Sequence, residues 1–262
     1  MSEKTSYAPG TPSWVDLGTP DQDAAGEFYG ALFGWALDEG ENPEATGGYR
    51  SAMLRGQPVG GVMKLMQEGQ PPAWSTYISV EDADATMAAV HANGGKTMIE
   101  PMDVLDIGRM AFFIDPTGAV CGLWQPRSFK GAGLVNEPGA FCWNELDTRD
   151  PEAAKAFYGA VFGWTFEDHD MGEGGIYTEW KLGADPIGGM MDMRGRVPDE
   201  VPANWLVYFA VPDTDAALET VKGSGGNVAF GPIDIPAGRF AVVSDPFGTV
   251  FAVIQMPEEA AA

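Results

Sequence analysis

The sequence predicts an α+β protein built from two tandem copies of one domain, and two observations carry this prediction. Residues 14–37 and 143–166 match at 13 of 24 positions at an offset of 129, including a shared FYGA and a shared FGW. Within each copy, short runs with strand-like alternation are mixed with stretches of helical periodicity. A repeat near 130 residues has the size of a whole domain, because solenoid repeats are much shorter.

The repeat fixes the expected domain boundaries. We place the first domain at 12–126 and the second at 140–256, because similarity continues beyond the first helix. Pro58-Val59-Gly60-Gly61 corresponds to Pro186-Ile187-Gly188-Gly189, and such paired glycines indicate a close backbone approach or a bulge. Residues 127–139 are rich in glycine and lack periodicity, so they are expected to be a linker.

Each copy is expected to contain the order β-α-β-β-β twice. In the first copy, the signals are alternation in the strands, Asp before each helix and Gly after it. They predict strands at 13–18 and 74–80, apolar runs at 48–54 and 57–65, helices over about 23–33 and from 82 to 93, and three closing strands.

Composition limits the classes of partner. Fifteen basic and 38 acidic side chains give a formal charge of −23, so nucleic acid and anionic membrane surfaces are not expected partners. The first residues contain no apolar signal segment, and no run is long enough to span a membrane, so we expect a cytoplasmic protein. The two cysteines, Cys121 and Cys142, are expected to be small buried hydrophobes. His91 is expected on the surface of a helix and His169 in an acidic loop, too few for a histidine-rich metal centre.

The helix with F-Y-x-x-x-F-G-W after a strand, followed by G-G, V-x-D and D-P-x-G, resembles the vicinal oxygen chelate family. That family includes glyoxalase I, extradiol dioxygenases, and fosfomycin- and bleomycin-resistance proteins. The resemblance covers nearly the whole chain in two copies. It implies two glyoxalase-like domains, each made of paired βαβββ modules that curl into a cup around a ligand. The chain is also similar to tandem, acidic actinobacterial members that are loosely labelled hydroxylase.

The resemblance also implies where metal ligands would lie: seven residues before each of the two helix-opening Asp residues, and seven after the Asp of D-P-x-G. Those positions hold Trp14, Ser75 and Gly122 in the first copy and Trp143, Leu206 and Ala252 in the second. None is a His, Glu, Asp, Gln or Cys, and divalent metals need such donors. We therefore predict no bound metal and no cofactor, and the family's metal chemistry does not transfer.

Strand alternation indicates which other side chains share each cup. They are Asp16, Tyr77 and Trp124 in the first copy and Glu145, Tyr208 and Ile254 in the second. The two tryptophans Trp14 and Trp143 either fill the space of the absent metal or form a wall that stacks a flat ligand. The acids Asp16 and Glu145 are expected to pair with Arg109 and Arg239, or to act as a general base beside a substrate.

Three functions stay open. The first is a small-molecule-binding protein of the bleomycin-resistance type that sequesters a planar or bulky metabolite or antibiotic. The second is a metal-free enzyme of secondary metabolism, with Asp16 or Glu145 and Tyr77 or Tyr208 as an acid–base pair. The third is an interaction protein whose cups are filled by their own side chains. The first cup is the more polar and aromatic, so it is expected to bind better. One chain supplies four modules, so a monomer is expected, although a homodimer stays possible.

Overall fold

The computed structural model describes residues 3–40, 42–67 and 69–257 and contains two copies of one α+β domain. The first is β1 (Pro12–Thr19), α1 (Gln22–Phe33), β2 (Ala36–Asp38), β3 (Arg50–Leu54), β4 (Gln57–Lys64), β5 (Ala73–Ser79), α2 (Ala83–Ala92), β6 (Lys96–Val104), β7 (Gly108–Ile114) and β8 (Val120–Pro126).

The second domain repeats that order with a short 3₁₀ turn added. It is β9 (Phe141–Thr148), α3 (Pro151–Phe162), β10 (Thr165–Asp170), η1 (Gly172–Gly174), β11 (Ile176–Leu182), β12 (Asp185–Asp192), β13 (Asn204–Ala210), α4 (Thr214–Gly223), β14 (Asn227–Ile235), β15 (Gly238–Ser244) and β16 (Val250–Gln255). The predicted order of two βαβββ modules per domain is confirmed. His169 lies in strand β10, however, so its prediction as a loop residue is wrong.

Each domain forms one eight-stranded mixed sheet. Its strand order is β2-β3-β4-β1-β5-β8-β7-β6 in the first domain and β10-β11-β12-β9-β13-β16-β15-β14 in the second. The two modules of a domain join where β1 pairs antiparallel with β5, and β9 with β13. The first strand of every module therefore lies at the centre of its sheet, where the two modules together build one cup.

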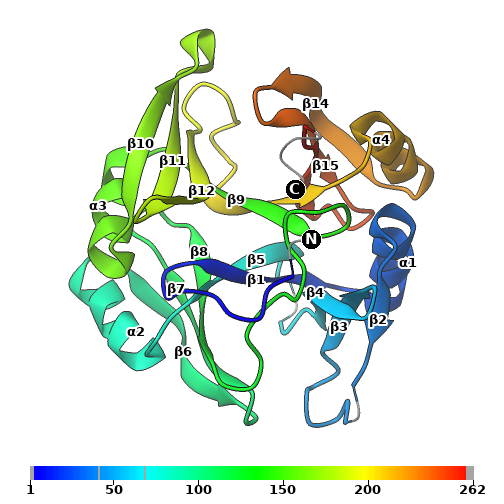
Figure 1. The fold of residues 1–262 in the computed structure, drawn as a ribbon, viewed down its shortest axis with the longest axis horizontal. Coiled ribbons are helices and arrows are strands. Elements are labelled where there is room, and N and C mark those ends of the chain that lie inside the picture. The colour runs from blue at the N-terminus through cyan, green and yellow to red at the C-terminus, as the bar shows by residue number, and fades with distance from the viewer. Residues whose placement is uncertain (1–2, 41, 68, 258–262) are drawn as a thin grey trace.

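The helices begin and end where the sequence signals indicate. Asp21 accepts hydrogen bonds from the first-turn amides of α1, and Asp82, Asp150 and Asp213 cap the other helices with their side chains. Gly34 ends α1 in the left-handed conformation with φ 75°. The four helices lie in two pairs at opposite sides of the molecule, with α2 beside α3 and α1 beside α4 (Figure 1).

The repeated FYGA and FGW segments join the two domains. Tyr29 donates to the Asp245 carboxylate of the second domain at 3.2 Å, and Tyr158 donates to Asp115 of the first at 2.9 Å. The indole of Trp35 donates to the Gly139 carbonyl at the end of the predicted linker, and that of Trp164 donates to the Gly10 carbonyl just before the first domain. The conserved spacing within the repeat thus serves an interface that is nearly twofold symmetric.

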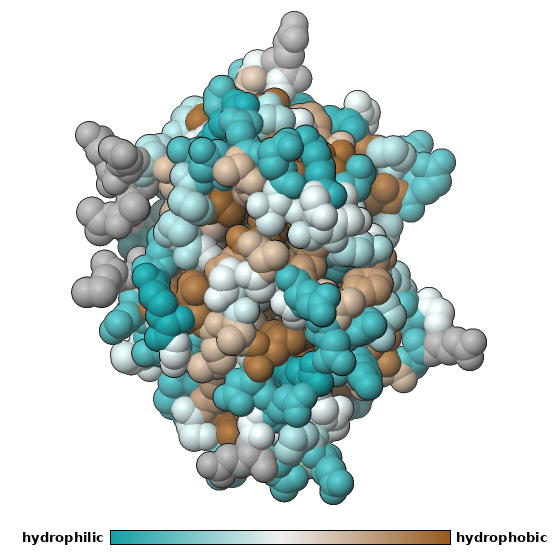
Figure 2. Space-filling model, turned by 90° about the vertical axis from the view of Figure 1, so that its right-hand side faces the viewer, coloured by the Kyte–Doolittle hydropathy of each residue, from teal (hydrophilic) through white to brown (hydrophobic). Residues whose placement is uncertain are grey.

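The predicted linker, residues 127–139, is packed against the first domain. Ala132, Leu134 and Val135 are buried, and the amide of Ala132 donates to the Ser13 carbonyl at 2.9 Å. The face over α1 and α4 is mostly hydrophilic, with hydrophobic residues interspersed near its middle (Figure 2). No helix among the described residues is long and apolar enough to cross a membrane.

Candidate functional site: two cups with buried carboxylates

The first cup contains a chain of hydrogen bonds that ends on a buried acid. The indole of Trp14 donates to the Tyr49 hydroxyl at 2.8 Å, and the Tyr77 hydroxyl donates to Asp16 at 2.8 Å. Asp16 is only 3% exposed. The predicted residues Trp14, Asp16 and Tyr77 therefore do meet on one face, as strand alternation requires.

Burial dominates the ionisation of this acid. Desolvation raises the pKa of Asp16 to about 6, although hydrogen bonds from Tyr77, Ser75 and Tyr49 favour the charged form and limit the rise. The predicted site residue Ser75 is thus one of the groups that surround the carboxylate.

A residue of the predicted linker covers the first cup. The ring of Phe129 lies edge-on to Trp14, with centroids 4.8 Å apart, and also contacts Trp124 at 5.7 Å. The indole of Trp124 donates to the Phe129 carbonyl at 3.0 Å, which holds the segment in place. Trp14 and Trp124 are 5% and 6% exposed, so this cup is closed by the protein's own side chains.

The second cup repeats the chain but contains one more acid. Trp143 donates to the Tyr177 hydroxyl at 2.8 Å, and the Tyr208 hydroxyl donates to Glu145 at 2.9 Å. Asp147 lies two residues further along β9, is 7% exposed and hydrogen-bonds Glu145. Burial and the charge of Glu145 raise the pKa of Asp147 well above its usual range, and burial also raises that of Glu145.

An aromatic wall leads from these acids to the surface. Tyr208 lies 5.8 Å from Phe240, and Phe240 lies 6.2 Å from Phe230, which is 53% exposed. Trp143 and Tyr177 are partly exposed, unlike the buried Trp14. Leu206 and Ile254 pack against this wall, with Ile254 in the predicted cup position. The second cup is therefore the more accessible of the two.

The predicted pairing of the acids with arginines is wrong. Arg109 binds Asp84 of α2 at 2.7 Å and Asp103 at 3.1 Å, and Arg239 likewise binds Asp215 and Asp234. On β7, Phe112 contacts Tyr77 in the cup, so alternation turns Arg109 to the helix side. The cup acids receive hydroxyl donors in place of cations.

The cups do not fit the family's metal. Gly122 and Ala252 have no donor atom, Leu206 is apolar, and Trp14 and Trp143 use their only polar atom as a donor. In the described chain, one group of three donors lies close enough to share an ion: Glu167, His169 and Glu179. It lies on the hairpin β10–β11, and Lys181 forms ion pairs with both glutamates. The ammonium group of Lys181 therefore already supplies the positive charge that a metal ion would bring to this group.

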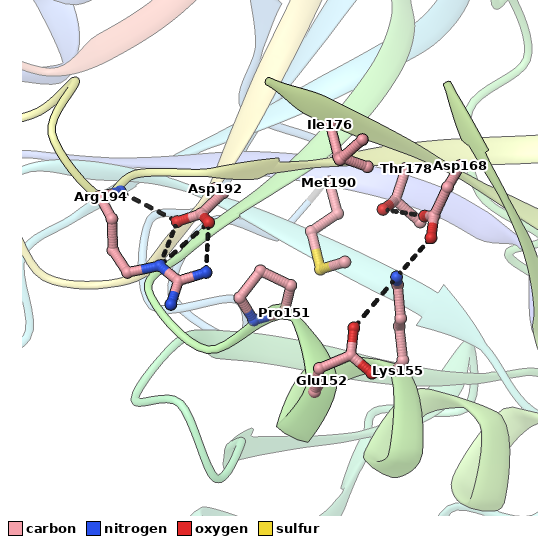
Figure 3. A pocket seen from close by; sticks show the side chains of 9 residues that line it. All are labelled: Pro151, Glu152, Lys155, Asp168, Ile176, Thr178, Met190, Asp192 and Arg194. Atoms are coloured by element: carbon pink, nitrogen blue, oxygen red, sulfur yellow. Dashed lines mark hydrogen bonds and ion pairs between the residues drawn. The ribbon is translucent and has the colours of Figure 1, made fainter. Parts of the chain in front are cut away.

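A further depression lies outside the cups, beside the start of α3, with a volume of about 200 Å³ (Figure 3). Its charged side chains are paired: Arg194 binds Asp192, and Lys155 bridges Glu152 and Asp168. A similar depression flanks the start of α1. The charges of the first depression neutralise one another, and neither depression contains a buried acid with a raised pKa, so the cups remain the candidate site among the described residues.

Sequence reasoning missed four cup residues: Tyr49, Tyr177, Asp147 and Phe129. The signal for the tyrosines was present in the glycine pairs, because a Cβ on Gly61 would lie 1.8 Å from the Tyr49 hydroxyl. On Gly189, it would lie 1.9 Å from that of Tyr177. Each glycine makes room for a tyrosine.

The fold and the paired cups agree with comparisons to known proteins. Residues 11–121 and 144–253 match the Glyoxalase/Bleomycin resistance protein/Dioxygenase superfamily. The chain therefore belongs to this superfamily.

Particular relatives cover nearly the whole chain. This chain is 45% identical over 97% of its length to "Putative glyoxylase CFP32" of Mycobacterium tuberculosis (strain CDC 1551 / Oshkosh), and the match covers 98% of that protein. It is 37% identical to "Anthracycline biosynthesis protein DnrV" of Streptomyces peucetius, over 97% of this chain and 96% of the relative. Among solved structures, the Mn(II)-bound glyoxalase from Novosphingobium aromaticivorans aligns with a TM-score of 0.64 at 17% identity, covering 97% of this chain and 83% of that one. At 17% identity, the likeness to this solved structure shows the fold alone.

Proposed function

We propose that this protein binds a planar aromatic small molecule in its second cup without a bound metal. The observation that carries the proposal is the wall from Glu145 through Tyr208 and Phe240 to the exposed Phe230. Aromatic side chains stack flat rings, and the few polar groups at the base orient them.

The relatives support the class of ligand. A protein that covers nearly the same length at 37% identity is named for anthracycline biosynthesis. We infer a role in the handling of polycyclic aromatic metabolites, either sequestration or a step of their synthesis. The second cup is the better candidate, against the expectation from sequence, because Phe129 covers the first.

Tryptophan fluorescence tests the proposal. Titration with 2-methylanthraquinone is expected to quench emission of the wild type, and Trp143→Phe is expected to lose much of that change. Trp14→Phe is the matched control in the covered cup, and it should bind as the wild type does. The absence of saturable binding, or loss of binding from Trp14→Phe alone, would contradict the proposal.

A second candidate is a metal-free enzyme that uses the same cup. Glu145 and Asp147 are buried acids with raised pKa values beside the Tyr208 hydroxyl, which suits proton transfer to or from a bound substrate. Conversion of a polycyclic phenolic substrate by wild type but not by Glu145→Gln, followed by mass spectrometry, would favour catalysis. Binding without turnover would favour sequestration.

A further inference from the structure

Asp147 has a carboxylate oxygen that no protein group satisfies. Its Oδ1 atom is buried and receives no hydrogen bond from the described residues, while the residue is 7% exposed. Alternation along β9 places Asp147 on the same face as Trp143 and Glu145, so the side chain points into the second cup. A buried polar atom without a partner is unfavourable by about 1–3 kcal/mol, so it calls for an explanation.

The neighbouring groups are committed elsewhere. Asn204 pairs with Asp147 across the sheet, but its amide donates to the Pro202 carbonyl at 3.1 Å. Arg149 binds the backbone of residues 197–201. Glu145 accepts from Tyr208 and shares a hydrogen bond with Asp147. These neighbours therefore leave the buried Oδ1 atom of Asp147 without a donor among the described residues.

Two carboxyl groups this close and this buried hold one proton between them, since both cannot ionise in a low dielectric. The pair then has about one negative charge. Among the described residues, neither acid forms an ion pair: Arg149 and Arg239 pair with other acids. Such a pair favours a partner that donates a hydrogen bond or carries positive charge.

The first cup lacks this feature. The position that corresponds to Asp147 is Gly18, and Asp16 has Tyr77, Ser75 and Tyr49 around it. The unsatisfied acceptor is therefore specific to the second cup, which is the more accessible of the two. An acid with a purely structural role would be expected in both cups, but the first cup has Gly18 at this position.

We propose that Asp147, supported by Glu145, selects ligands that place a hydrogen-bond donor, a hydroxyl or a protonated amine, against its free oxygen. This inference rests on the proposed function, because the donor belongs to the planar molecule stacked on the aromatic wall. Asp147 is a specificity residue: it recognises a substituent, while the rings supply the contact area.

Three probes with one ring system separate the contribution of the stacked rings from that of the hydrogen-bond donor: 2-methylanthraquinone, 2-hydroxyanthraquinone and 2-(aminomethyl)anthraquinone. The two donor-bearing probes are expected to bind the wild type about tenfold more tightly than the methyl probe. In Asp147→Asn, the advantage of the amine should fall to about twofold or less. The hydroxyl should retain part of its advantage, because an amide oxygen still accepts.

The matched control is Asp192→Asn, which neutralises an acid of β12 that binds Arg194 outside the cup. It should leave all three affinities unchanged. Thermal unfolding adds a second measurement: Asp147→Asn should be at least as stable as the wild type, because the uncharged amide can still donate a hydrogen bond to Glu145.

The outcomes distinguish the two proposals. If no probe binds, the proposed function fails. If the methyl probe binds as tightly as the donor probes, or if Asp147→Asn keeps the preference for the amine, the function stands and the role of Asp147 is refuted.

Discussion

At the scale of single residues, the feature common to both cups is a buried carboxylate that is hydrogen-bonded by a tyrosine. Asp16 and Glu145 each accept a hydrogen bond from a tyrosine hydroxyl, whereas the sequence predicts an arginine as the partner. A hydroxyl donor adds no positive charge, so desolvation can raise the pKa of the buried acid above its usual range. This makes the pH dependence of stability a direct test of the site.

Asp16 gives the clearest prediction of that kind. Its pKa rises to about 6 in the folded protein from 3.8, so the folded state holds the proton that the unfolded state has already released. Stability should therefore fall as pH rises between about 4 and 6. The loss is about 3 kcal/mol by pH 7, at about 1.4 kcal/mol per unit. In urea unfolding at pH 4 and pH 7, the wild type should lose more stability than Asp16→Asn by about this amount, because the raised pKa values of Glu145 and Asp147 contribute equally to both proteins. Parallel profiles for the two proteins would contradict the assignment.

Metal content is a second prediction at this scale. Purified protein should contain no stoichiometric zinc, iron or manganese, and EDTA should leave ligand binding and thermal stability unchanged. The reason is the donor-poor set Trp14, Ser75, Gly122, Trp143, Leu206 and Ala252 at the family's ligand positions. About one metal ion per cup by elemental analysis would overturn it.

At the scale of elements, the repeat and the alternation of strands predicted most of the architecture. Alternation predicts Trp14 and Asp16 on one face of their strand, together with Tyr77 of the next module, because every second residue of a strand points the same way. The same rule applied to β7 turns Arg109 away from the cup, whereas opposite charge and the matching positions of Arg109 and Arg239 in the repeat favour the pairing that the structure contradicts. Phe129 could not be found, because a segment without periodicity gives no register.

That segment supplies a prediction of its own. Phe129 packs on both Trp14 and Trp124, so Phe129→Ala should expose them. Acrylamide quenching is expected to increase, and the lost contact should destabilise the fold by about 2–4 kcal/mol, since the ring is only partly buried. Phe230→Ala, which removes an exposed ring of the other cup, serves as control and should change neither stability nor quenching strongly. Unchanged quenching in Phe129→Ala would show that the cup is not covered by this ring.

At the scale of the whole molecule, the two domains are tied by reciprocal hydrogen bonds. Tyr158 reaches Asp115, and Tyr29 reaches Asp245, in each case from a helix of one domain to a turn of the other. Aromatic rings of both domains also pack together, as in Phe33 with Phe209 at 4.9 Å. The domains should therefore not unfold independently.

We expect one cooperative unfolding transition in calorimetry. Tyr158→Phe should lower stability by about 1–3 kcal/mol, because Asp115 then loses the donor to one buried oxygen. The transition should stay single and move to lower temperature. Two resolved transitions in the wild type would show that the interface is weak.

The assembly state follows from the same architecture. Each sheet already has two modules, so neither cup needs a second chain, and light scattering should report a mass near 27.9 kDa. An obligate dimer would contradict this.

The extra acid of the second cup has a meaning that only a fused chain permits. In an assembly of identical subunits, every substitution occurs in both sites, so a pocket cannot be closed in one and elaborated in the other. Joining the halves removes that restriction. Gly18 and Asp147 occupy matching positions, and Phe129 covers one hollow while Phe230 borders the other. Because the two copies lie in one chain, one cup can be covered while the other differs from it at a matching position, as Gly18 and Asp147 do.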